Sequence, residues 1–184
     1  MGAERLAWWS RREALGLGLI ASTSLVGFGS ALYGRGDRQL LGSRSYPLGR
    51  LRDLDKRLDA TGGLLTFPEL RAHLVRYSPT AETRAMYSES VPGLLLLSWV
   101  CPHLGCKLPM CDSSQWFECP CHGARFNGIG EYKFGPPPRG MDRYALRPDL
   151  SGNVLLADTA HVVPGAPRGT NTIGQLPAGA HCVG

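Results

Sequence analysis

The chain has 184 residues, of which 19% are charged and 43% hydrophobic, and its mean hydropathy is -0.12. That length fits one domain, and the composition excludes both a disordered polyelectrolyte and a protein with several membrane spans. The formal net charge is +5, but residues 1–50 hold seven arginines against three acidic residues, so +4 of it belongs to the N-terminal segment. Because a nucleic-acid-binding protein carries its positive charge on the folded domain, we expect no nucleic-acid partner.

Residues 14–34 form an uncharged run of 21 residues, which as a helix would span about 30 Å, the thickness of a bilayer core. We therefore expect residues 1–34 to form a cytoplasmic N-terminus and a single transmembrane anchor, with the rest of the chain outside the cell membrane. Arg11 and Arg12 precede the run and resemble a twin-arginine export signal, although two arginines also favour a cytoplasmic N-terminus by themselves. A cleaved signal peptide is the alternative, but the run is long for one.

Residues 35–50 contain several glycines and are predicted to form a flexible neck. Residues 73–78 alternate between polar and apolar side chains and predict a strand within a mixed region. The apolar run at residues 94–100 is short and follows Pro-Gly, which favours a buried strand that leads to Cys101.

Short strands are also predicted near the second group of cysteines and beyond it. Residues 115–118 and 125–126 read as strands beside a loop, and turn-forming residues 149–153 predict a hairpin between two further strands. Beyond Asp158 the chain is rich in glycine and proline and reads as irregular. The sequence therefore predicts an all-β, antiparallel domain over residues 51–184.

Two boxes of cysteine and histidine carry the chemistry: CPHLGC at residues 101–106 and CPCHGA at residues 119–124. A [2Fe-2S] cluster held by two cysteines and two histidines needs one of each from two loops, and C-x-H and C-x-x-H supply them. A tetrahedral zinc ion is the alternative. Zinc is disfavoured because C-x-H is tighter than ordinary zinc-ligand spacing, and because one cysteine in each box would have no role.

The boxes resemble those of Rieske iron-sulfur proteins, especially the membrane-anchored subunit of quinol:cytochrome c oxidoreductases, the cytochrome bc-type complexes. The resemblance implies a Rieske-type antiparallel β-sandwich head with a cluster-binding part at about residues 94–146, carried on one N-terminal transmembrane helix. Rieske ferredoxins and ring-hydroxylating oxygenases are similar in the ligand core but lack an additional cysteine in each box. The presence of this pair therefore favours the membrane-anchored subunit.

The resemblance also implies roles for individual residues. By the family pattern, one [2Fe-2S] cluster is held by Cys101 and Cys119 on one iron and by His103 and His122 on the other, and Cys106 forms a disulfide with Cys121. Quinol would hydrogen-bond to a histidine, preferably the second-box one, and pass on one electron and one proton. The second electron would go to a cytochrome b subunit, and the head would carry its electron to a c-type cytochrome.

A proline run at residues 135–138 resembles the family's proline loop, which covers the cluster. Leu104 and the prolines, Pro137 among them, would then form an apolar tip that docks at the quinol site. Ordinary loop packing is the alternative reading of Leu104.

Two positions depart from the family pattern. Many respiratory members have a serine and a tyrosine whose hydroxyls bond cluster sulfurs, but this chain has Ala124 and Phe126 there. Because such bonds stabilise the reduced state, their loss predicts a low reduction potential, matched to menaquinol. A low potential also leaves open a Rieske subunit of another oxidoreductase, such as an arsenite-oxidase-like enzyme, or a stand-alone electron carrier.

Cys111 and Cys182 are the two cysteines outside the boxes. An exported head would lie in an oxidising compartment, so we expect these cysteines to form a second disulfide that ties the C-terminal segment beside the cluster loop. Two free thiols are the alternative.

Overall fold

A computed structural model describes residues 45–184 of the chain. The predicted membrane anchor, its arginine pair and residues 35–44 of the predicted neck lie outside the described residues. Within residues 45–184, none of the helices has the length and apolar character needed to cross a membrane.

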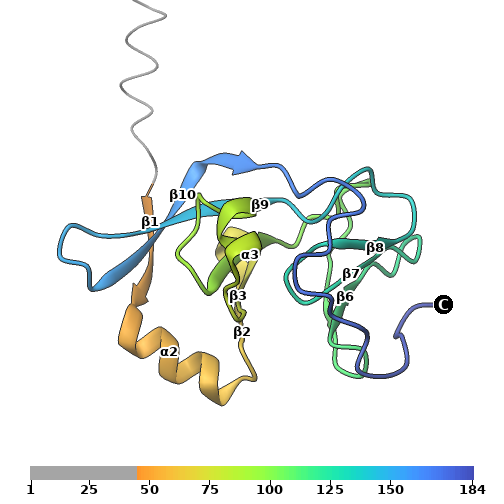
Figure 1. Cartoon of the computed structure of the whole chain (residues 1–184), viewed down its shortest axis with the longest axis horizontal. Helices are drawn as coiled ribbons and strands as arrows, with labels where there is room; N and C mark the ends of the chain where they lie inside the picture. The colour runs from red at the N-terminus through yellow and green to blue at the C-terminus, as the bar shows by residue number, and fades with distance from the viewer. Residues whose placement is uncertain (1–44) are drawn as a thin grey trace, which may run out of the picture. The chain divides into compact units, whose positions relative to one another are not determined.

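The described residues form two antiparallel sheets (Figure 1). The larger sheet has the order β1-β10-β9-β4-β3-β2, with β1 (Ser45–Arg50), β2 (Leu64–Phe67), β3 (Ala72–Arg76), β4 (Leu94–Ser98), β9 (Arg143–Pro148) and β10 (Val154–Val163). The smaller sheet has the order β5-β6-β7-β8, with β5 (Met110–Cys111), β6 (Trp116–Glu118), β7 (Arg125–Phe126) and β8 (Tyr132–Phe134). Three short helical elements lie between the strands of the larger sheet: α2 (Leu51–Ala60), the 3₁₀ turn η1 (Pro68–Leu70) and α3 (Ala81–Met86).

Strand β4 is buried on both faces, which explains why its sequence is a continuous apolar run. Leu94 and Leu96 belong to the core that lies under α2, whereas Leu95 and Leu97 belong to the core shared with Phe117 of the smaller sheet. Since successive side chains of a strand point to opposite faces, one strand joins both cores. The same strand leads the chain to the first box, as predicted.

The all-β prediction holds in its coarser form, because the domain is mostly β but contains α2 and α3. In α2, Leu54 and Leu58 are buried and lie four residues apart, on the same face of the helix. This spacing among charged residues was a readable helix signal that the sequence interpretation missed.

Two strand boundaries also differ from the prediction. Ser45–Arg50 form β1, which pairs with β10, so the end of the segment predicted as a neck belongs to the sheet. Strand β10 continues to Val163 rather than ending near Asp158. The register between β10 and β9 shifts after Ala157 and resumes where Val162 pairs with Tyr144. Because of this irregularity, the second half of the strand could not be predicted from the sequence.

Candidate metal centre

The first box folds into a closed turn just after β4. The amide of Cys101 donates to the carbonyl of Cys106 (2.8 Å), and the amide of Gly105 donates to the carbonyl of Cys101 (2.9 Å). Gly105 has a φ of 82°, a left-handed conformation that favours glycine. The turn presents His103 at its tip.

The second box folds into the same turn. The amide of Cys119 donates to the carbonyl of Ala124 (2.8 Å), and the amide of Gly123 donates to the carbonyl of Cys119 (3.1 Å). Gly123 has a φ of 67°. The two boxes are therefore equivalent hydrogen-bonded turns, although their sequences place the histidine differently.

The two turns bring the predicted ligands together in pairs, one histidine with the other and one free cysteine with the other. The rings of His103 and His122 lie 4.9 Å apart between centroids and are nearly perpendicular. Cys101 and Cys119 are buried, and they are the two free cysteines of the described chain, which contains all six. Two free thiols and two imidazoles from two loops fit the ligand set of a [2Fe-2S] cluster with mixed cysteine and histidine coordination.

The Cys101 thiol does not ionise easily by itself. Burial raises the pKa of the Cys101 thiol to about 11, and the adjacent Cys119 sulfur adds to the shift. A metal ligand must be the thiolate, so the positive charge of a bound metal has to stabilise that form.

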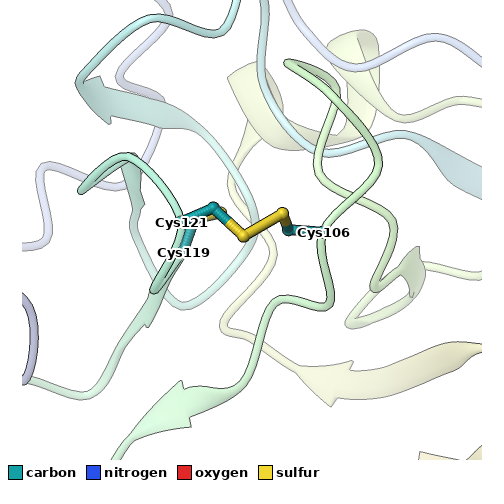
Figure 2. Close-up of side chains that lie close together, drawn as sticks. All are labelled: Cys106, Cys119 and Cys121. Carbon is teal, nitrogen blue, oxygen red and sulfur yellow. A yellow bond between two sulfur atoms is a disulfide. The ribbon is translucent and has the colours of Figure 1, made fainter.

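The disulfide between Cys106 and Cys121 joins the two turns, as Figure 2 shows. Its two sulfurs and the free sulfur of Cys119 lie within 4.8 Å of one another. Because both cysteines are consumed by the disulfide, neither can be a ligand, and the bond instead fixes one turn against the other.

The second predicted disulfide, between Cys111 and Cys182, is also present and spans 71 residues. It holds the C-terminal segment beside β5 and β6, where the dark blue trace of Figure 1 runs along the smaller sheet.

A buried carboxylate next to this disulfide was not singled out from the sequence. Glu118 directly precedes Cys119 and is 1% exposed. One of its oxygens contacts the Ser114 hydroxyl and Nδ1 of His181 (both 2.6 Å), and the other accepts the amides of Cys182 (2.7 Å) and Val183 (3.0 Å). Burial alone would raise the pKa of Glu118, but these hydrogen bonds outweigh it and lower the pKa.

The proline loop, residues 135–138, packs directly on the second turn. A β-carbon added at Gly135 would lie 2.7 Å from the Cα of Ala124, and Gly135 has a φ of 96°. Pro137 is buried, whereas Leu104 is 71% and Phe134 57% exposed. Of the residues predicted to form an apolar tip, Leu104 is therefore exposed and Pro137 is not, while Phe134 adds a further exposed apolar side chain.

The two positions that depart from the family pattern are both enclosed. Ala124 is 1% exposed, and Phe126 is fully buried in the core shared by the two sheets. Neither side chain carries a hydroxyl, so neither can donate a hydrogen bond to a metal-bound sulfur.

Comparison with known proteins agrees with this geometry. Residues 72–145 match the family model described as the Rieske [2Fe-2S] domain. The "Cytochrome b6-f complex iron-sulfur subunit" of Chlorobaculum thiosulfatiphilum is 36% identical over 67 residues, which cover 36% of this chain and 36% of the relative. The "Ubiquinol-cytochrome c reductase iron-sulfur subunit" of Rhodobacter capsulatus is 33% identical over 112 residues, covering 59% of this chain and 52% of the relative.

The chain thus spans between about a third and about half of the length of these curated relatives. Among solved structures, the soluble domain of the Rieske protein II (soxF) from Sulfolobus acidocaldarius gives a TM-score of 0.46 at 21% identity, covering 70% of this chain and 85% of that chain. Residues 72–145 are thus similar to the Rieske [2Fe-2S] domain, and with the two free cysteines and the two facing histidines the cofactor is one [2Fe-2S] cluster.

Proposed function

We propose that the chain is the electron-transfer subunit of a quinol-oxidising, bc-type respiratory complex. In this proposal Cys101 and Cys119 ligate one iron, and His103 and His122 ligate the other. When bound, the cluster supplies one-electron chemistry, accepting an electron from quinol and passing it to a c-type cytochrome. The named subunits among its relatives support this assignment, and a cytochrome b subunit would take the second electron. Alone, the chain would not turn over quinol.

One observation carries the proposal: the second-box histidine is open to solvent. His122 is exposed, whereas His103 is half-buried and Cys101 and Cys119 are buried. A quinol hydroxyl can therefore approach the ring nitrogen of His122 that does not face iron. That nitrogen would accept the hydrogen bond and then the proton of the quinol.

The surroundings of His122 favour an apolar ligand. Leu104 in the first turn and Phe134 at the end of β8 have exposed side chains, which would present apolar surface to a docking partner. We propose that this tip docks on a cytochrome b subunit in the membrane, with the head outside and residues 1–34 as its anchor.

Ala124 and Phe126 favour a low-potential donor such as menaquinol. A reduced cluster carries one more negative charge than an oxidised one, and hydroxyl donors near its sulfurs stabilise that charge. Both positions are enclosed and lack a hydroxyl. The same feature supports the second candidate function, a low-potential Rieske subunit of another oxidoreductase.

The test combines a redox titration with a reduction assay. The double variant Ala124→Ser, Phe126→Tyr should have a higher midpoint potential than the natural chain, and no rise would contradict the low-potential proposal. In membranes, menaquinol should reduce the cluster, and an inhibitor of the quinol site should block this reduction. Reduction that the inhibitor does not affect would favour an electron carrier outside a bc-type complex.

A further inference from the structure

We propose that Arg168 is a positioning residue that holds the proline loop against the second cysteine-histidine turn. Arg168 follows β10 and reaches back across more than thirty residues of sequence. Its Nε donates to the carbonyl of Pro137 (2.7 Å), and its Nη2 donates to the carbonyl of Gly135 (3.0 Å). The planar guanidinium thus bonds two carbonyls of one loop at once.

The proline loop needs such a partner because it offers few donors of its own. Three of its four residues are prolines, which have no backbone N–H, so the loop can be held mainly through its carbonyls. The Tyr132 hydroxyl also donates to the carbonyl of Gly135 (2.7 Å), and the Arg168 guanidinium lies 4.4 Å from the centroid of the Tyr132 ring. Arg168 and Tyr132 therefore contact each other and both donate a hydrogen bond to the carbonyl of Gly135.

The backbone that carries Arg168 lies against the residues that directly follow the proline loop. Pro167 pairs with Arg139 in an isolated antiparallel bridge, and the amide of Gly140 donates to the carbonyl of Ala166 (2.8 Å). Backbone bonds therefore already hold the end of the loop beside this segment, and the two bonds of the arginine side chain extend the attachment to Gly135 and Pro137.

The position of the loop is passed on to the candidate ligands through one close contact. Gly135 packs on Ala124, with no room for a side chain between them. The carbonyl of Ala124 closes the turn by accepting the amide of Cys119. A loop released by Arg168 would therefore loosen the turn that presents Cys119 and His122. This inference rests on the [2Fe-2S] cofactor and not on the identity of the electron donor or acceptor.

The test uses the full chain with its cluster and compares three variants. Arg168→Ala removes both bonds, Arg168→Lys keeps the charge but not the planar fork, and Arg147→Ala is the control, since Arg147 is exposed and bonds Ser45 in the larger sheet. Two quantities are measured: the rate at which visible absorbance is lost in the presence of an iron chelator, and the midpoint potential.

We expect Arg168→Ala to lose its cluster about tenfold faster than the natural chain and to shift in potential, since supporting contacts of metal ligands typically contribute that much affinity. Arg168→Lys should lie between the two, and Arg147→Ala should match the natural chain. An Arg168→Ala variant that unfolds at a lower temperature but keeps the natural rate and potential would overturn the proposal, because the arginine would then be merely structural.

A second variant keeps the test decisive if Arg168→Ala does not accumulate. Tyr132→Phe removes only the hydroxyl that bonds the same Gly135 carbonyl, so the fold is retained. It should accelerate cluster loss in the same direction but less. A rate equal to that of the natural chain, in the absence of an Arg168→Ala result, would overturn the proposal.

Discussion

Gly105 and Gly123 occupy the same place in two equivalent turns, since each donates its amide to the carbonyl of the cysteine four residues earlier. The histidines do not share this equivalence, because His103 comes two residues after its cysteine and His122 comes three residues after. The result is one half-buried and one exposed imidazole on a nearly symmetric frame. The unequal spacing of the two boxes thus accompanies an unequal exposure of the two histidines.

Substituting Gly135 should displace the proline loop. Gly135→Ala forces a side chain into a left-handed conformation and against the backbone of Ala124, so we expect a loss of about 3 kcal/mol in the free energy of unfolding. Gly152→Ala is the matched control, because Gly152 also has a positive φ but no atom within 4 Å of the added carbon. It should lose about 1 kcal/mol. Urea denaturation measures both, and equal losses would argue against the close contact.

Removing the Cys111–Cys182 disulfide should destabilise the domain. The bond closes a long loop, and the chain-entropy model gives about 4 kcal/mol for a separation of 71 residues. We expect the Cys111→Ser, Cys182→Ser variant to unfold at a clearly lower temperature. The natural chain can also be treated with a reductant, and mass spectrometry then shows whether this disulfide has opened. An unchanged melting temperature after the bond has opened would contradict the expectation.

Glu118→Gln should release the C-terminal segment from the second box. The amide oxygen of glutamine can replace one carboxylate oxygen. The glutamine NH₂ group would replace the other, and as a donor it cannot accept the hydrogen bonds that the amides of Cys182 and Val183 give to Glu118. Loss of hydrogen bonds to a buried charge typically reduces stability by about 2 kcal/mol. Hydrogen exchange at Cys182 and Val183 should rise sharply, and it should stay unchanged in Glu69→Gln, where the carboxylate is exposed and bonds only the Tyr46 hydroxyl among the described contacts.

His73 should make the stability of the domain depend on pH. Burial lowers the pKa of His73 from its ordinary value of 6.5, with Lys107 adding to this effect and the hydrogen bond to the Leu108 carbonyl opposing it. The unfolded chain therefore binds a proton at a higher pH than the folded chain does. The contribution of His73 is full above about pH 6.5 and decreases as the pH falls below that value.

Urea denaturation at pH 7.5 and 5.5 would measure this contribution. The difference in unfolding free energy between the two pH values should be smaller in His73→Gln than in the natural chain. His161→Gln is the matched control for the same substitution at an exposed histidine. Identical pH dependence in His73→Gln and the natural chain would show that His73 titrates alike in both states.

Features with a local cause could be predicted from the sequence. The apolar run of β4 and the box motifs depend on neighbouring residues. The resemblance of the boxes to a known family implied the Cys106–Cys121 disulfide, and the two cysteines left outside the boxes predicted the second one. The signal for helix α2 is also local, since Leu54 and Leu58 lie on one face of it. From the sequence, this region was assigned only as mixed, and the helix was not predicted.

Contacts between residues far apart in the chain could not be predicted, because they produce no local pattern in the sequence. Glu118 meets His181 across 63 residues, and Arg168 meets Pro137 across 31. Glu118 and Arg168 look like ordinary charged residues in the sequence. Their roles arise only because the C-terminal segment folds back over the smaller sheet. The bulge in β10 is a similar case, because its second half regains its register only through pairing with β9.

The Cys111–Cys182 bond makes a covalent ring of the chain between these two residues, and that ring contains the second box, the proline loop and Arg168. A protease that nicks the exposed hairpin turn near Leu150 would therefore cut the backbone without separating the fragments. Under non-reducing conditions the nicked protein should still migrate as one molecule, because the disulfide keeps residues 151–184, Arg168 among them, attached to the part of the chain that carries both boxes.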